Sequence, residues 1–122
     1  MDIKAITNAT AQVLMSYLTY QAIRVVAAQL RETDPPRAVW FSQFSTQATL
    51  QDGEAYLEQL TTQNPDLAFR VMTVREHLAE QVVDSLPELT RDGIRRANQQ
   101  RRGRYIEQML QLPSPESRGE NP

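Results

Sequence analysis

The sequence predicts an all-α protein, and three observations carry this prediction. Apolar residues recur at helical spacing, most clearly in Leu67, Val71, Val74, Leu78 and Val82, which lie four, three, four and four positions apart. No run of four or more residues alternates apolar and polar side chains with β-branched enrichment, which is the pattern of a half-buried strand. Proline, glycine and asparagine fall between the periodic stretches. We therefore expect a small helical bundle, and 122 residues fit one domain.

The first helix is predicted to run from Ile3 to Glu32, before the turn Thr33-Asp34-Pro35-Pro36. On a helical wheel, one side has a core composition: Ala11, Leu14, Leu18, Ala22 and Val25. A second arc, roughly opposite, carries Ile6, Val13, Tyr17 and Tyr20 together with Arg24 and Arg31. A second apolar face indicates another element, a second subunit or a ligand groove. The periodicity leaves open whether the two tyrosines are core aromatics or part of a binding surface.

Three further helices are expected along the chain. The second covers about Arg37–Thr46, the third about Gly53–Thr62 with Asp52 as its N-cap, and the fourth begins at Asn64-Pro65-Asp66. The fourth continues to about Leu112, and Pro87 either kinks it or separates two helices. The predicted domain is residues 1–112, with residues 113–122 as a disordered tail because they hold no apolar anchor.

Composition argues against several classes of protein. The chain has no cysteine, a net charge of −2 and a single histidine, His77, in the middle of a helix. Thiolate chemistry is therefore excluded, and we expect neither a metal site nor a cofactor site nor an enzyme, because no nucleophile and base can be paired. The N-terminus lacks a signal pattern and no apolar run is long enough for a membrane span, which predicts an intracellular protein.

Arginines crowd the segment Arg91 to Arg104, which we call the basic strip. Arginines on a helix can neutralise phosphates, so a nucleic-acid binder is one alternative. The same residues can also complement the dipole at a helix C-terminus, or pair with carboxylates at a protein interface. Because the whole chain is near neutral, we prefer an acidic protein partner to a nucleic acid.

Several stretches together resemble the RbcX family of Rubisco assembly chaperones, in the order and at the spacing found in that family. They are Ser16-Tyr17-Leu18-Thr19-Tyr20-Gln21-Ala22, Glu32-Thr33-Asp34-Pro35-Pro36, Gln51-Asp52-Gly53-Glu54-Ala55-Tyr56, Met72-Thr73-Val74-Arg75-Glu76-His77 and Leu86-Pro87-Glu88. The resemblance covers about residues 1–110. It implies an arc-shaped homodimer in which the long, proline-kinked C-terminal helices pack antiparallel.

The resemblance also implies two binding surfaces. Tyr17, Tyr20 and Leu50 match a groove that takes up the C-terminal tail of the Rubisco large subunit, a segment alternating acidic and aromatic residues. Gln29, Glu32, Arg70 and Arg102 match a polar surface that contacts the body of large subunits. The implied function is to stabilise large-subunit dimers until they assemble into the octameric core, after which small subunits displace the chaperone. The runner-up is a generic helical peptide-binding adaptor.

The absence of a transit-like pattern at the N-terminus favours the cytoplasm of a cyanobacterium over a plastid stroma as the expected location, with carboxysome association allowed. The expected partners are the large subunit and a second copy of the chain, with no nucleic acid and no membrane.

Overall fold

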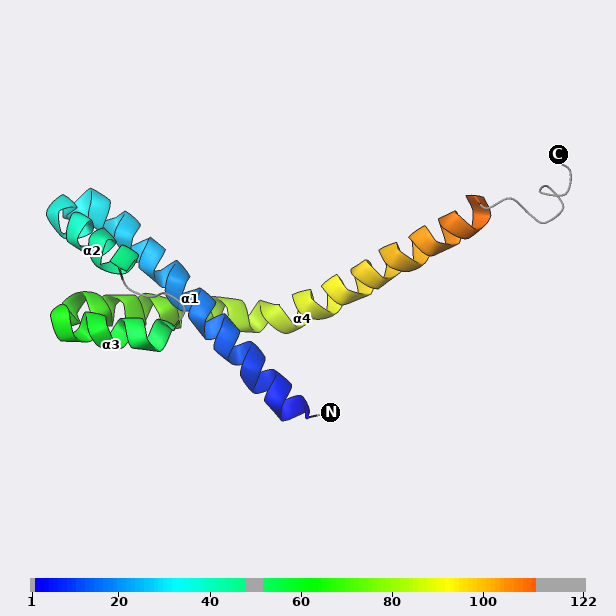
Figure 1. Cartoon of the computed structure of the whole chain (residues 1–122), viewed down its shortest axis with the longest axis horizontal. Coiled ribbons are helices and arrows are strands. Elements are labelled where there is room, and N and C mark those ends of the chain that lie inside the picture. The colour runs from blue at the N-terminus through cyan, green and yellow to red at the C-terminus, as the bar shows by residue number, and fades with distance from the viewer. Residues whose placement is uncertain (1, 48–51, 112–122) are drawn as a thin grey trace, which may run out of the picture. The chain divides into compact units, whose positions relative to one another are not determined.

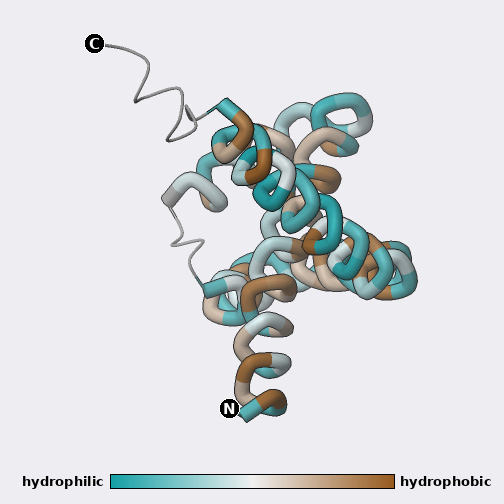
Figure 2. Tube along the Cα trace, turned by 90° about the vertical axis from the view of Figure 1, so that its right-hand side faces the viewer, coloured by the Kyte–Doolittle hydropathy of each residue, from teal (hydrophilic) through white to brown (hydrophobic). Residues whose placement is uncertain are grey.

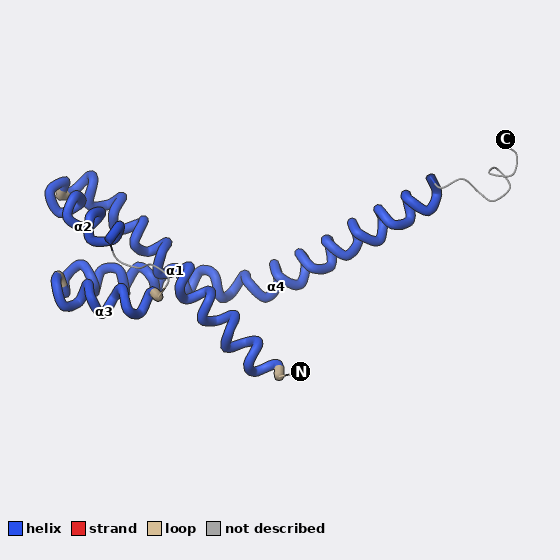
Figure 3. The backbone as a smooth tube through the Cα atoms, viewed as in Figure 1, coloured by secondary structure: helices blue, strands red, loops and turns tan. Residues whose placement is uncertain are grey.

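The structure is a computed structural model that describes residues 2–47 and 52–111. Over these residues it consists of four α-helices joined by short connections, and it has no strand (Figure 3). The prediction of an all-α protein is therefore confirmed. The predicted tail, residues 113–122, and Leu50 lie outside the described residues.

Helix α1 spans Ile3–Thr33, close to its predicted limits. The Asp2 carboxylate caps its first turn by accepting a hydrogen bond from the Ala5 N–H at 3.2 Å. At the other end, the Asp34 N–H donates to the Leu30 carbonyl at 2.8 Å, and Asp34 leaves the helical conformation. The residue before Pro35 thus ends α1, as steric restriction by a following proline requires.

Helix α2 spans Pro35–Gln47 and begins two residues before the predicted start at Arg37. The prolines were expected to lie in a turn, but they occupy the first two helical positions, where no N–H needs an intrahelical partner. The Asp34 carboxylate accepts from the Arg37 N–H at 3.4 Å and completes the cap. Asp34 therefore separates α1 from α2 without any intervening loop.

Helices α3 (Gly53–Gln63) and α4 (Pro65–Gln111) begin at the predicted caps. The Asp52 carboxylate accepts from the N–H groups of Glu54 and Ala55 at 3.0 and 3.3 Å, and the Asn64 side chain accepts from Leu67 at 3.2 Å. Pro87 lies inside α4, so the segment is one helix and not two separate helices.

The chain divides into two compact units, Met1–Val82 and Val83–Pro122. In unit 1, α2 lies alongside α1, and α3 also packs against α1 (Figure 1). All four helices contribute buried residues to one core cluster in this unit. The largest of its fully buried side chains are Tyr56, Phe41, Leu30, Leu60 and Leu67.

Two half-buried aromatic residues, Trp40 and Phe44, pack against the buried Tyr56 at the edge of this core. Phe44 lies between Trp40, with ring centroids 5.4 Å apart, and Tyr56, with centroids 5.6 Å apart. The Tyr56 hydroxyl is 2.8 Å from the Ser45 hydroxyl, so its polar end has a partner inside the core. Burial raises the pKa of Tyr56 above 10.0, and the hydrogen bond with Ser45 opposes that rise.

Unit 2, over its described residues, is the continuation of α4 from Val83 to Gln111. Its large apolar side chains are at least a third exposed in the single chain, and they are Val83, Leu86, Leu89, Ile94, Tyr105, Ile106, Met109 and Leu110. Val83, Ile94 and Tyr105 follow one another at intervals of eleven residues. Since eleven residues are close to three full turns, the three side chains lie along one line of the helix.

Candidate functional site

The outward side of α1 carries two tyrosines in a solvent-exposed position. Tyr17 is 59% exposed and Tyr20 is 41% exposed, whereas Leu18 and Ala22, on the opposite side, are buried in unit 1. Ile6 and Val13 share the outward side and are also exposed, and Figure 2 shows hydrophobic positions along the N-terminal turns of α1. We call Ile6, Val13, Tyr17 and Tyr20 the tyrosine face. The interpretation of these tyrosines as core aromatics of this chain is wrong. The predicted core side is buried at Leu18 and Ala22 but exposed at Ala11, so two distinct faces are confirmed for the part of α1 from Leu18 onward.

Tyr20 has a cationic neighbour. The guanidinium carbon of Arg24, one turn further along α1, lies over the Tyr20 ring at 6.0 Å from its centroid. Leu50, the third residue that the sequence assigns to the groove, lies outside the described residues. The structure thus brings together Tyr17 and Tyr20 on one helix side and adds Arg24 to them.

Two of the four polar-surface residues meet in unit 1. Arg70 of α4 donates from Nη2 to the Gln29 side-chain oxygen of α1 at 2.9 Å, which joins residues 41 positions apart. Glu32 is exposed in the last turn of α1, close in sequence to Gln29. Arg102 is exposed and belongs to unit 2. The structure therefore joins Gln29 with Arg70. The assignment of Glu32 and Arg102 to the same surface stays a prediction.

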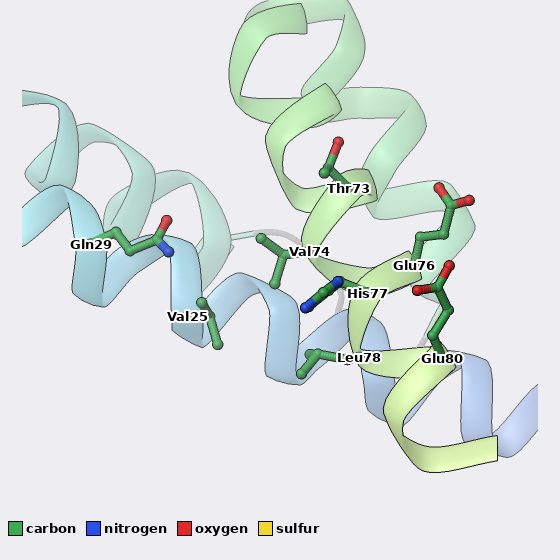
Figure 4. A pocket seen from close by; sticks show the side chains of 8 residues that line it. All are labelled: Val25, Gln29, Thr73, Val74, Glu76, His77, Leu78 and Glu80. Atoms are coloured by element: carbon green, nitrogen blue, oxygen red, sulfur yellow. The ribbon is translucent and has the colours of Figure 1, made fainter. Parts of the chain in front are cut away.

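A cavity of about 420 Å³ lies between α1 and α4, next to this pair (Figure 4). Val25 and Gln29 line it from α1, and Val74, His77 and Leu78 face them from α4. Glu76 and Glu80 also border it, yet over residues 2–47 and 52–111 no three His, Cys, Asp or Glu side chains are placed to hold a metal ion. His77 borders the cavity and is exposed to solvent.

Sequence reasoning assigned no role to Arg75, which the structure places among three helices. Its guanidinium Nη1 donates to the Glu54 carboxylate at 2.6 Å and to the Thr19 hydroxyl at 3.2 Å. Because Thr19 is a buried residue of α1, Arg75 ties the centre of that helix to α3 and α4. The arginine therefore helps to fix the helix that carries the tyrosine face.

Gly53 permits this close approach. A Cβ atom added there would lie 3.0 Å from the Thr19 hydroxyl oxygen and 3.1 Å from both side-chain carbons of that threonine. The first turn of α3 can therefore pack against α1 only with a residue that lacks a side chain or with a shift of Thr19. The one available sequence signal was the position of Gly53 directly after a helix N-cap.

Over the residues that the structure describes, no helix combines the length and the apolar character that a membrane crossing requires.

Comparisons with known proteins identify the family. The family model described as RbcX protein matches residues 1–111. The RuBisCO chaperone RbcX of Thermosynechococcus vestitus is 56% identical over 112 residues, which cover 92% of this chain and 89% of the relative. That of Nostoc sp. is 52% identical over 121 residues, covering 96% and 91% of the two chains.

Solved structures agree with these relatives. A crystal structure of RbcX in complex with substrate superposes on this chain with a TM-score of 0.79 and 40% sequence identity, over 91% of this chain and all of the other. Identity at this level over nearly the whole length shows common ancestry as well as a common fold. The chain belongs to the RbcX family.

Proposed function

We propose that this protein is an assembly chaperone for the large subunit of Rubisco, and that its tyrosine face binds the C-terminal tail of that subunit. The curated relatives are named RuBisCO chaperones, and a similar RbcX structure was solved in complex with substrate. The observation that carries the proposal is the exposure of Tyr17 and Tyr20 on a helix whose opposite side is buried in the core at Leu18 and Ala22. Exposed tyrosines at such a density are typical of recognition surfaces.

The physical chemistry of this face suits an extended, partly aromatic peptide. The tyrosine rings and the neighbouring aliphatic side chains offer apolar contact area, while the phenol hydroxyls keep hydrogen-bonding capacity at a wet boundary. Aromatic side chains of the tail would contribute most of the binding free energy. A flexible tail loses conformational entropy on binding, so the affinity is moderate and the small subunits can displace the chaperone.

Gln29, Glu32, Arg70 and Arg102 form the second part of the proposal, as a polar surface for the body of a large subunit. The bond between Gln29 and Arg70 holds both side chains in place at the junction of α1 and α4. An arginine fixed in this way can present its remaining N–H groups to carboxylate or carbonyl oxygens of another protein. The tail and the body would then be held at once, which stabilises large-subunit dimers for assembly into the octameric core.

The proposal includes a homodimer, in which the exposed apolar line Val83, Ile94 and Tyr105 of α4 is covered by a second copy. It also places the protein in the cytoplasm of a cyanobacterium, as the source of its relatives suggests. The relatives are named chaperones, so the proposed role is binding without catalysis. Leu50 belongs to the proposed groove on the strength of the resemblance alone.

The test is a titration with a synthetic peptide that has the sequence of the C-terminal tail of the large subunit, using a scrambled peptide as control. We expect saturable binding of the native sequence at one peptide per dimer, and loss of binding in Tyr20→Ala. Phe69→Ala is the matched control, because Phe69 is 58% exposed, almost as much as Tyr17, but lies on α4. Equal peptide affinity in Tyr20→Ala and the unaltered protein would contradict the groove assignment.

The polar surface is tested in the same samples by assembly of large subunits into the octameric core. Arg70→Ala or Arg102→Ala is expected to bind the peptide normally and to lose assembly. If either variant loses peptide binding as well, the two surfaces have been divided wrongly.

A further inference from the structure

Among the residues that the structure describes, Arg24 is the cation that contacts the tyrosine face of α1. Its side chain is exposed, and its guanidinium carbon lies 6.0 Å from the centroid of the Tyr20 ring. A guanidinium over an aromatic face is attracted by the negative charge density of the ring. At this distance the ring does not use the N–H groups of the guanidinium, which remain available as donors. Arg24 therefore presents hydrogen-bond donors beside the exposed surface of Tyr20.

Within the described part of the chain, this guanidinium has no anionic partner. Among residues 2–47 and 52–111, the ion pairs are formed by Arg37, Arg75 and Arg95, and Arg24 takes part in none of them and in no hydrogen bond. Helix α1 holds no acidic residue before Glu32. Since Glu32 is eight positions from Arg24, it lies about 12 Å away along the helix axis, beyond hydrogen-bonding reach.

A guanidinium free to bind an anion, beside two exposed tyrosine rings, fits one kind of ligand. Arginine forms its strongest contacts with carboxylates, which it can bind through two parallel hydrogen bonds. The tyrosine rings next to it favour an apolar or aromatic side chain. A peptide that carries an acidic residue next to an aromatic one satisfies both at once, whereas a neutral apolar peptide leaves the charge unused.

From this arrangement we infer that Arg24 binds a carboxylate of the peptide that lies on the tyrosine face, and so selects acidic peptides. The inference rests on the proposed function, in which the peptide is the C-terminal tail of the Rubisco large subunit. It goes beyond that proposal because it assigns to one residue the recognition of the peptide's charge. Tyr20 then has two functions, contact with the peptide and orientation of the guanidinium.

Arg31 offers a matched control on the same helix. It is exposed, lies on the same arc of the helical wheel two turns further on, and forms no ion pair among the described residues. It borders a different cavity, with Pro35, Ala38 and Val39, and lies in the last turn of α1, where a cation complements the helix dipole. Removing its charge changes the net charge as much as removing that of Arg24.

The experiment measures the affinity of the full-length protein for the synthetic tail peptide and for peptides in which each acidic residue in turn is replaced by its amide. The proteins are the unaltered chain, Arg24→Gln and Arg31→Gln. We expect Arg24→Gln to bind the native peptide about five-fold more weakly, which is the upper end of the range for an exposed charge pair. Arg31→Gln is expected to bind within about two-fold of the unaltered chain, as general charge effects screened by salt allow.

The decisive result is the coupling between the Arg24→Gln substitution in the protein and the loss of one carboxylate in the peptide. For one particular acidic position, the amide peptide is expected to bind the unaltered chain and Arg24→Gln equally, because the carboxylate that Arg24 contacts is then already absent. Unchanged affinity in Arg24→Gln, or a loss of the same size for every amide peptide, would overturn the assignment while Tyr20→Ala still loses binding. No binding by the unaltered chain would overturn the proposed function, and the assignment with it.

Discussion

The two units of the chain differ in where their apolar side chains lie. In unit 1, residues from four helices form one buried cluster, and Ala22, Val26, Phe41 and Leu60 have no exposed surface. In the described part of unit 2, every large apolar side chain is at least a third exposed. One helix alone cannot enclose a core, so helix formation there satisfies the backbone but leaves the apolar face in water. Unit 1 is therefore stabilised by its own packing, whereas the apolar side chains of unit 2 are available to the second copy that we propose.

This difference divides the functional residues as well. The tyrosine face, Gln29 and Arg70 are positioned by the core of unit 1, and Arg75 adds hydrogen bonds that connect three helices. Arg102 and the basic strip lie on the exposed helix of unit 2. Mutations in the two units should therefore differ in effect, with loss of folding stability in unit 1 and loss of self-association in unit 2.

The largest effect is expected in the core of unit 1. Phe41→Ala removes a fully buried ring and is expected to lower the free energy of unfolding by about 4 kcal/mol, because the surrounding helices can only partly close the cavity. Urea unfolding followed by circular dichroism, at one fixed protein concentration, measures this loss. Val39→Ala on the same helix is the control, since Val39 is 58% exposed and its change should stay within about 0.5 kcal/mol.

In unit 2 the expected effect is on association. Ile94 lies in the middle of the exposed line on α4 and is 59% exposed. If a second copy covers it, Ile94→Asp places an unpaired charge in the interface, and self-association should weaken by on the order of 100-fold. Light scattering over a dilution series would show the shift from dimer to monomer.

Gln99→Asp provides the control for this experiment. It introduces the same charge on the same helix, but about 140° away on the helical wheel, so its self-association should match that of the unaltered chain. A dimer that is equally stable in Ile94→Asp would exclude this line as the interface between copies.

The sequence predicted those features that depend on local pattern. The caps at Asp52 and Asn64 were identified because short polar side chains before a helical period have one common use, to accept from free N–H groups. The two faces of α1 were identified because the spacing of Tyr17 and Tyr20 separates them from Leu18 and Ala22 by roughly half a turn. Four helices, with limits close to those observed, follow from such signals.

Features that depend on contacts between distant segments were not predictable. Arg75 has the sequence context of a surface residue, and only the approach of α1 and α3 gives it Thr19 and Glu54 as partners. The resemblance assigned Gln29 and Arg70 to one surface, but their hydrogen bond was not predicted, because periodicity carries no information on which helices touch. The start of α2 at Pro35 was missed because Pro35 and Pro36 suit both a turn and a first helical turn.

Arg75→Met should therefore lower the stability of the fold, although the sequence around Arg75 is that of a surface residue. It removes the hydrogen bonds to Glu54 and Thr19, and the expected loss is about 1.5 kcal/mol of unfolding free energy, since the arginine is largely shielded and its partner carboxylate is not. Arg95→Met in unit 2 is the control, because its 3.9 Å pair with Asp92 is exposed on both sides and should contribute nothing measurable. Equal losses in the two variants would mean that Arg75 does not tie the helices together.

The smallest effect concerns the Tyr56 hydroxyl, and it depends on pH. Tyr56→Phe removes its hydrogen bond with Ser45 and should cost about 0.5 kcal/mol at neutral pH. The folded-state pKa of Tyr56 is raised above 10.0, so above that pH the unfolded chain releases a proton that the folded chain retains. The stability contributed by the neutral phenol is thus complete below pH 10 and is lost as the pH rises through the folded-state pKa. In Tyr56→Phe this part of the alkaline decline should disappear, so unfolding curves of the two proteins should converge above pH 10, and parallel declines would show that Tyr56 ionises freely in the folded core.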